Sequence, residues 1–335
     1  MPSTRKNLTV RRILVAIRDT QQPLRQQLSK AAVLARSLGA SVELFHAITE
    51  PIAPRLMHRR DGFENVFASA REMVEKRLQR RLDKLAHSPE LRGLRVHSVL
   101  SWDYPPHEAV VRHVLATRAD LVIAGTRERS FGTRLLLTNT DWELVRQCPC
   151  LLLLVKSSRD YRKPAVIASI DPFHAHAKPA RLDDRIVDVG AAIAKRLGGQ
   201  LHVFHAYLPL TILAPGPAGQ PLALAPSPEL EDVHTESVST VFGKFAEKAG
   251  VPPARRHLHM GDVTSELESV VKKTNAGIVV MGAVSRSRLR RIFIGNTAES
   301  VLDRLSCDLL VVKPGRFVTE VPKRPRAALT ARAGK

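Results

Sequence analysis

The apolar residues of the chain fall into short runs that alternate with amphipathic segments, and the whole alternation occurs twice. Between the runs, apolar residues recur at helical spacing, as at Leu24, Leu28 and Ala31. Strands that are joined through helices pair in parallel and are buried on both faces. Each half therefore predicts an α/β domain with the order β-α-β-α-β-α-β-α-β and a doubly wound parallel sheet. The runs that predict strands lie at 12–17, 42–47, 94–100, 121–124 and 151–155, and again at 165–170, 201–206, 256–260, 278–281 and 307–312.

The two series are copies of one another. Residues 119–156 and 276–313 align at an offset of 157, which matches Gly125 with Gly282 and Cys150 with Cys307. Upstream of these segments, 44–47 and 203–206 match at an offset of 159. A nearly constant offset over such a span indicates one domain written twice.

The repeat sets the domain boundaries that we predict. An N-terminal domain over 1–156 and a C-terminal domain over 164–315 are joined by a short polar linker, and each has the usual size of a self-sufficient core. Residues 208–228 are rich in Pro, Gly, Ala and Leu and predict a loop. Residues 316–335 are basic and lack periodicity, which predicts a disordered tail.

The charge and the lengths of the apolar runs bear on binding partners and on cellular location. The formal net charge is +20 and the pI is about 10.6, which favours weak binding of polyanions with little sequence preference. The apolar segment 13–17 is too short for a signal peptide and no run is long enough to span a membrane, so we expect a cytoplasmic protein. Three cysteines without a framework predict buried free thiols.

One loop in each repeat has the features of an anion site. In the second repeat, the strand at 278–281 ends at Gly282, and a basic loop leads to Gly295, where a helical pattern begins. Backbone N–H groups and the helix dipole favour an anion at such a helix start. Parallel sheets bind ligands outside the carboxyl ends of their strands, which is where this loop begins.

These residues resemble the universal stress protein family, and the tandem E-type members in particular. The family has an Asp after its first strand and a late G-x2-G-x9-G-[ST] segment. The second repeat has Asp171, then Gly282, Ser285 and Gly295 at the family's spacing, with serine in place of the middle glycine. The resemblance covers residues 11–315 and implies two tandem flavodoxin-like (Rossmann-like) domains with an ATP or other adenine-nucleotide site. The residues that it implies for that site are Asp171, Val203, Met281, Gly282, Ser285, Gly295, Asn296 and Thr297.

The first repeat departs from the family pattern. Arg18 stands in the place of the Asp, Glu128 replaces the second glycine, and Thr138 replaces the third. An acidic side chain beside a phosphate is unfavourable. We therefore expect ATP in the C-terminal domain only.

Paired histidines raise the question of a metal. His174 and His176 lie in one loop, and His257 and His259 share one face of a predicted strand, a spacing that suits Zn²⁺. No complete ligand pattern is present, so we interpret them as partly exposed histidines without a metal. His46 and His205 occupy equivalent positions in the two repeats, and we expect backbone groups to satisfy them.

The resulting hypothesis is a tandem universal stress protein without identifiable catalytic residues, in which adenine nucleotide changes the affinity for partners. Slow ATP hydrolysis is the most that we expect of it as an enzyme. Two alternatives stay open: a basic, nucleic-acid-associated scaffold and a weak ATP hydrolase. The resemblance further implies that the two domains pair as an intramolecular pseudo-dimer through 151–155 and 309–312, and it leaves room for homo-oligomers.

Overall fold

The computed structural model describes residues 8–22, 24–49, 63–128, 135–136, 139–173, 181–215, 220–283 and 304–324. The chain forms two compact units. The N-terminal unit comprises Thr9–Tyr161 together with the segment that begins at Gly315. The C-terminal unit comprises Arg162–Pro314. The chain therefore leaves the N-terminal unit after Tyr161 and returns to it at Gly315.

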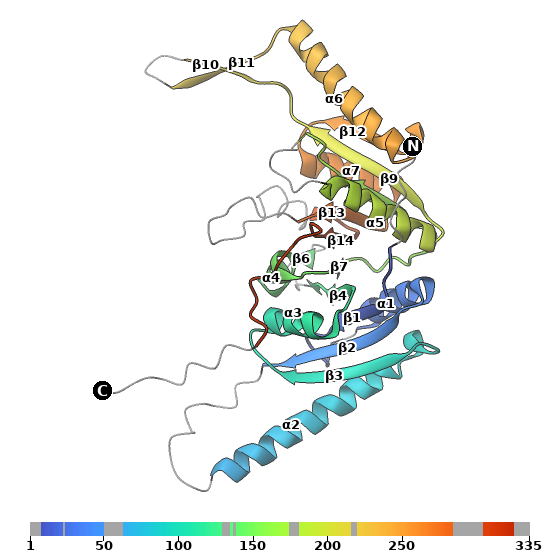
Figure 1. Ribbon diagram of the computed structural model, residues 1–335, viewed down its shortest axis with the longest axis vertical. Helices are drawn as coiled ribbons and strands as arrows, with labels where there is room; N and C mark the ends of the chain where they lie inside the picture. The colour runs from blue at the N-terminus through green and yellow to red at the C-terminus, as the bar shows by residue number, and fades with distance from the viewer. Residues whose placement is uncertain are drawn as a thin grey trace, which may run out of the picture. The chain divides into compact units, whose positions relative to one another are not determined.

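The N-terminal unit is a parallel sheet in the order β7-β4-β1-β2-β3, flanked by helices (Figure 1). Every helix and strand predicted for this half is present, within about two residues at each end. A two-residue pair, β5 (Arg127–Glu128) with β6 (Leu135–Leu136), stands outside this sheet. The principal elements are β1 (Arg12–Ala16), α1 (Arg25–Leu38), β2 (Ser41–Ile48), α2 (Phe63–Ala86), β3 (Val96–Trp102), α3 (Pro106–Thr117), β4 (Leu121–Gly125), α4 (Asn139–Gln147) and β7 (Leu151–Val155).

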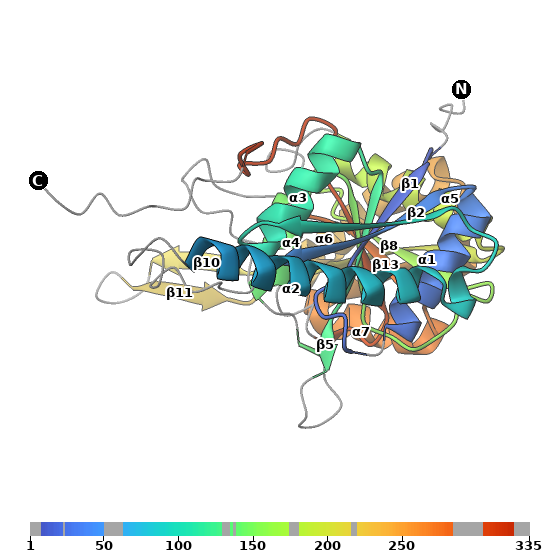
Figure 2. The ribbon, with the colours of Figure 1, turned by 90° about the horizontal axis from the view of Figure 1, so that it is seen from below.

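Helices cover both faces of this sheet. His113 of α3 stacks on Phe45 of β2, with ring centroids 4.5 Å apart. On the opposite face, Gln79 of α2 donates a hydrogen bond to Ser98 Oγ at 2.9 Å. Ser98 pairs with Leu44, the neighbour of Phe45, and consecutive residues of a strand point to opposite faces. Figure 2 shows α3 on one side of these strands and α1 and α2 on the other.

The C-terminal unit repeats the arrangement with the strand order β12-β9-β8-β13-β14. One difference from the sequence prediction is a β-hairpin, β10 (Ile212–Pro215) with β11 (Pro221–Leu224), inside the segment predicted as a loop. The residues of both strands are apolar or small, without the alternation of apolar and polar residues that would have predicted strands. The other elements are β8 (Ala165–Ser169), α5 (Leu182–Arg196), β9 (Gln200–Tyr207), α6 (Pro228–Lys248), β12 (Arg256–Met260), α7 (Val263–Thr274), β13 (Ile278–Gly282) and β14 (Asp308–Val312).

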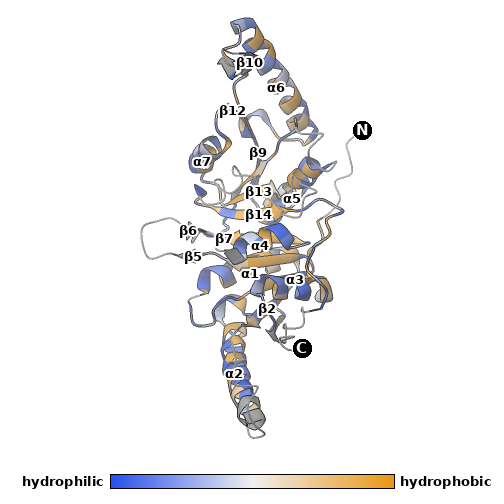
Figure 3. Ribbon diagram, turned by 90° about the vertical axis from the view of Figure 1, so that its left-hand side faces the viewer, coloured by the Kyte–Doolittle hydropathy of each residue, from blue (hydrophilic) through white to orange (hydrophobic). Residues whose placement is uncertain are grey.

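The two cores are built from equivalent residues. Phe45 and Phe204 are separated by the repeat offset and are both buried, at 1% and 0% exposure. Burying such a ring stabilises each unit by about 2–3 kcal/mol. Figure 3 shows the strands β13 and β14 as predominantly hydrophobic, as expected for strands covered on both faces. The prediction of a flavodoxin-like, doubly wound α/β fold is confirmed.

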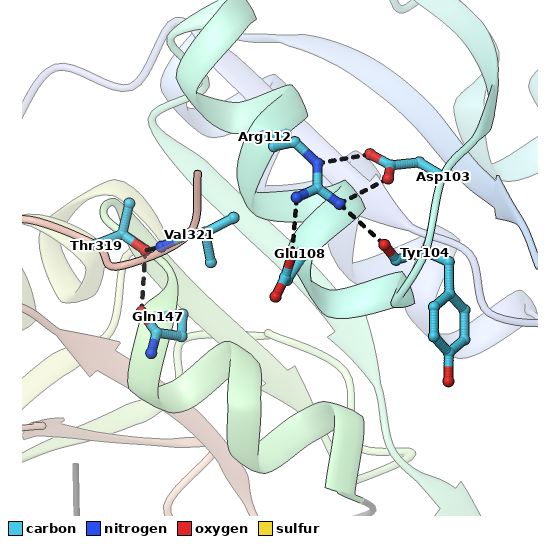
Figure 4. A network of polar contacts seen from close by, with 7 residues as sticks. All are labelled: Asp103, Tyr104, Glu108, Arg112, Gln147, Thr319 and Val321. Carbon is cyan, nitrogen blue, oxygen red and sulfur yellow. Dashed lines mark hydrogen bonds and ion pairs between the residues drawn. The ribbon is translucent and has the colours of Figure 1, made fainter. Parts of the chain in front are cut away.

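A buried ionic network fixes the segment between β3 and α3 (Figure 4). The guanidinium of Arg112 donates to both carboxylate oxygens of Asp103, at 2.7 and 2.6 Å, and to Glu108 Oε2 at 2.8 Å. The Arg112 side chain is 6% exposed. Burial alone would lower the pKa of Arg112, but the hydrogen bonds that it donates to Asp103 and Glu108 raise it above its usual value. The guanidinium of Arg112 therefore stays charged in spite of its burial.

The segment after Pro314 lies on the N-terminal unit, which differs from the disorder predicted for 316–335. Gln147, the last residue of α4, accepts hydrogen bonds from Thr319 Oγ1 at 3.0 Å and from the Glu320 N–H at 3.2 Å (Figure 4). Val321 is buried, with 7% exposure. One amide and one apolar side chain thus fix a segment that has no periodicity of its own. Residues 325–335 of the predicted tail lie outside the described residues.

Candidate functional site

Each sheet has a point at which the strand order reverses. In the C-terminal unit β8 lies between β9 and β13, and in the N-terminal unit β1 lies between β2 and β4. In doubly wound folds, ligands bind at this switch point, outside the carboxyl ends of the strands. The two switch points are the candidate sites, and they differ in what surrounds them.

The C-terminal switch point brings together three of the residues expected there. Asp171 follows β8, and Met281 and Gly282 end the neighbouring strand β13. The backbone N–H of Asp171 donates to Asp183 Oδ1 at 3.2 Å, and Asp183 lies in the first turn of α5. The backbone of Asp171 is thus held at the edge of the sheet where a helix begins.

Gly282 has a packing role beside any binding role. A Cβ at this position would lie 2.7 Å from Leu182 Cδ2 and 3.1 Å from Ile186 Cδ1. Those side chains belong to α5, which covers the end of β13. Only glycine therefore lets the helix approach this strand end so closely.

Val203 is not at this edge. It lies in the middle of β9, is fully buried, and pairs with Ala168 on one side and Arg256 on the other. The register places Val203 three residues before the level of Asp171, so the residue of β9 at the edge is Ala206. Sequence reasoning missed Ala206 because the strand pattern does not fix the level at which strands align.

Phe173 is a second residue that the sequence analysis did not select. It lies two residues after Asp171, is 38% exposed, and its ring centroid is 5.4 Å from that of His205. An aromatic residue two positions after the aspartate at the strand end was the sequence feature that could have identified it. The remaining expected residues, Ser285, Gly295, Asn296 and Thr297, lie outside the described residues.

The two repeat-equivalent histidines hold the strand ends in the same way. His46 Nδ1 lies 2.8 Å from the Ile17 carbonyl oxygen, and His205 Nδ1 lies 3.0 Å from that of Ile170. The expected backbone hydrogen bond is present at Nδ1 of both rings. The matching bonds also establish that Arg18, which follows Ile17, is the structural counterpart of Asp171.

At the N-terminal switch point, a glutamine side chain joins the two strand ends. Gln27 of α1 is 5% exposed and donates from Nε2 to the carbonyl oxygens of Ala16 and Ile123, both at 3.1 Å. A Cβ on Gly125 would lie 2.9 Å from Gln27 Oε1. The repeat offset of 159 places Ile186 at the equivalent position of the C-terminal unit, so this amide has no counterpart there.

An ion pair also distinguishes the N-terminal switch point. Arg18 donates to the carboxylate of Asp141, which is fully buried in the first turn of α4. A helix start favours negative charge, and here the protein supplies its own carboxylate. The offset of 157 places Ala298 opposite Asp141 in the second repeat. The sequences of the two repeats therefore differ in charge at this helix start.

The histidines of β12 form contacts but no metal cluster. His257 Nε2 lies 2.9 Å from His202 Nδ1, and His259 Nδ1 lies 2.7 Å from Glu266 Oε2. Burial, followed by the positive charges of neighbouring groups, lowers the pKa of His257 to about 4. Within the described ranges, no group of three or more His, Cys, Asp or Glu side chains could hold a metal ion. His174 and His176 lie outside those ranges.

The architecture and the paired strand-end histidines define a tandem, doubly wound α/β protein of the flavodoxin-like class. The universal stress protein family matches this chain over residues 9–156 and 181–313. The chain therefore belongs to that family, with two copies of its domain, as the sequence predicted.

Curated relatives agree with this assignment, and solved structures share the fold. The chain is 28% identical to universal stress protein E of Escherichia coli K12 over 237 residues, which cover 68% of this chain and 72% of the relative. It is 27% identical to the universal stress protein E homolog of Haemophilus influenzae over 252 residues, covering 73% and 78%. A universal stress protein from Archaeoglobus fulgidus shares the fold, with a TM-score of 0.57 at 13% identity, over 90% of this chain and 98% of that one. A functionally unknown protein from Pseudomonas aeruginosa PAO1 aligns with a TM-score of 0.65 at 23% identity, over 91% and 93%. Among the described residues, no helix is both long and apolar enough to cross a membrane.

Proposed function

We propose that the C-terminal unit binds an adenine nucleotide at its switch point and that the bound nucleotide changes the affinity of the protein for its partners during the stress response. The observation that carries this proposal is the contrast between the two switch points. In the N-terminal unit, Gln27 bridges the strand ends and Arg18 is neutralised by the protein's own Asp141. The C-terminal unit has Asp171 and, by the repeat offset, Ile186 and Ala298 in their places.

The chemistry of the C-terminal residues suits a nucleoside. The carboxylate oxygens of Asp171 can accept hydrogen bonds from ribose hydroxyls or from the adenine amino group. The ring of Phe173 offers an aromatic face, and stacking on an aromatic side chain stabilises a bound base by about 1–3 kcal/mol. Gly295, Asn296 and Thr297 would supply backbone N–H groups and side-chain donors to the phosphates at a helix start. The pairing of the two domains and the cytoplasmic location inferred from the sequence belong to the same proposal.

The test begins with small molecules released from freshly purified protein and identified by mass spectrometry. Calorimetry with ATP then compares the wild type with Asp171→Ala, for which we expect affinity to fall at least about tenfold, a loss of about 1.4 kcal/mol. Asp19→Ala is the matched control, because Asp19 follows Arg18 at the N-terminal switch point and accepts a hydrogen bond from the Gln21 N–H. A wild type that binds no adenine nucleotide, or a loss of binding in Asp19→Ala alone, would contradict the proposal.

A further inference from the structure

A separate pocket lies in the N-terminal unit at the amino-terminal ends of β1, β2 and β3. It has a volume of about 300 Å³ and is lined by Arg12, Ser41, Glu43, Arg95 and His97. The register pairs Arg12 with Ser41 and Glu43 with His97, so residues from three strands face one space. The amino ends of parallel strands lie at the edge opposite the switch point. This pocket is therefore distinct from the nucleotide site proposed above.

The carboxylate of Glu43 is only partly satisfied by the protein. Its side chain is 13% exposed, and its Oε1 lies 3.2 Å from His113 Nε2. Its other carboxylate oxygen, Oε2, is buried and has no hydrogen-bond partner. The hydrogen bond with His113 lowers the pKa of Glu43 against the opposing effect of burial, and the nearby charges of Arg12 and His97 act in the same direction as His113. An ionised carboxylate with one buried, unsatisfied oxygen is costly, and a ligand donor would remove that cost.

The remaining charge of the pocket is positive. Arg12 and Arg95 are both exposed and present two guanidinium groups against the single carboxylate of Glu43. The side chain of Arg12 donates one hydrogen bond to the Thr117 carbonyl oxygen. Within the described part of the chain, no hydrogen bond from the side chain of Arg95 is seen. Guanidinium groups recognise carboxylates and phosphates through paired N–H donors. The lining thus combines a site for an anion with a buried acceptor.

We propose that this pocket binds a small hydroxylated anion, a sugar phosphate or a sugar acid. The anionic group pairs with Arg95 and with the remaining N–H groups of Arg12, and a hydroxyl of the same molecule donates to the carboxylate of Glu43. The volume is at the lower end of the range for small-molecule sites, which suits a molecule of this size.

Calorimetry on the full-length chain tests the proposal. Saturating ATP is present throughout, so that binding of a probe at the proposed nucleotide site does not contribute to the measured heat. The probes are glucose 6-phosphate and gluconate, with glucose and inorganic phosphate as partial ligands. We expect at least one of the two full probes to bind more tightly than both partial ligands. Glu43→Gln and Arg95→Ala should each weaken that probe about tenfold. Arg92→Ala, which changes an exposed arginine three residues before Arg95 and outside the lining, should leave binding unchanged.

Three results would overturn the proposal. The first is that neither full probe binds in the millimolar range. The second is that glucose or inorganic phosphate binds as tightly as the full probe. The third is that Arg95→Ala binds the probe as tightly as the wild type does. Arg95 is exposed, so this variant tests the site even if Glu43→Gln perturbs folding. Because ATP occupies the nucleotide site in every titration, failure here leaves the proposed nucleotide function untouched. The relative strength of glucose 6-phosphate and gluconate decides between phosphate and carboxylate.

Discussion

Replacing Arg112 with methionine tests how far one buried ionic network supports the N-terminal unit. Methionine has about the length of the arginine stem but no charge and no N–H donors. It leaves the carboxylates of Asp103 and Glu108, with side-chain exposures of 7% and 14%, without their shared cation. Three hydrogen bonds to carboxylate oxygens are lost at once, and a fourth, to the Tyr104 carbonyl oxygen at 3.3 Å, is lost with them.

The expected cost is about 3–5 kcal/mol of unfolding free energy, the range for removing one partner of a buried ion pair. Most of that cost is repulsion and desolvation of the stranded carboxylates. A domain of this size has only about 5–15 kcal/mol of stability in total, so the effect is large.

The chain supplies its own probe for this measurement. Both tryptophans, Trp102 and Trp142, belong to the N-terminal unit, so intrinsic fluorescence during urea unfolding reports on that unit alone. A loss of 3–5 kcal/mol corresponds to a midpoint shift of roughly 1–3 M urea. The matched control is Arg25→Met, since Arg25 is 87% exposed and lies 3.5 Å from Glu90. That variant should lose no more than about 0.5 kcal/mol.

A urea midpoint for Arg112→Met that matches the midpoint of the Arg25→Met control would refute the reasoning.

Three further predictions concern the other parts of the chain. Gly295→Val should weaken ATP binding by roughly 1–3 kcal/mol, because a branched side chain blocks the approach of a phosphate. Thr138→Val should have no effect. Calorimetry that finds the loss only in Thr138→Val would place the ATP site in the N-terminal unit. The pKa of His257 is lowered from 6.5 to about 4, so the unfolded state binds more protons between these values and stability falls as the pH drops through that window. Allowing for the half-exposed ring, the loss at pH 5 should be about 1 kcal/mol and should disappear in His257→Gln, as measured by urea unfolding followed by circular dichroism; an equal loss in that variant would exclude His257 as the cause. Retention on heparin should fall steeply between low and moderate salt, because the net charge of +20 acts through counterion release, and salt-independent retention would exclude this explanation.

The sequence was most informative where hydrophobic periodicity and internal repetition reinforced each other. The strands and helices of both units were predictable because a buried parallel strand, such as Leu151–Val155, must be apolar on both faces. The glycine at 282 was also predictable, but its packing against Leu182 was not, because that contact joins residues 100 positions apart. The level of Val203 in the sheet was missed for the same reason, since register is set by pairing with other strands.

The N-terminal switch point shows a second limit of sequence reasoning. Arg18 and Thr138 revealed that the family pattern was absent, but nothing local indicated what had replaced it. The replacement depends on Arg18 and Asp141, which are 123 residues apart, and on Gln27, whose acceptor Ile123 is 96 residues away. A single glutamine in an amphipathic helix carries no sign of such a role.

The return of the chain to the N-terminal unit has a consequence for biosynthesis. The residues around Thr319 and Val321 leave the ribosome after the whole C-terminal unit has been made, yet they bond to Gln147 and bury a side chain in the unit that was made first. The N-terminal unit therefore cannot acquire its last contacts during its own synthesis. A polypeptide released before residue 319 would carry both domains but would lack these hydrogen bonds, so the N-terminal unit gains them only after the C-terminal unit has been made.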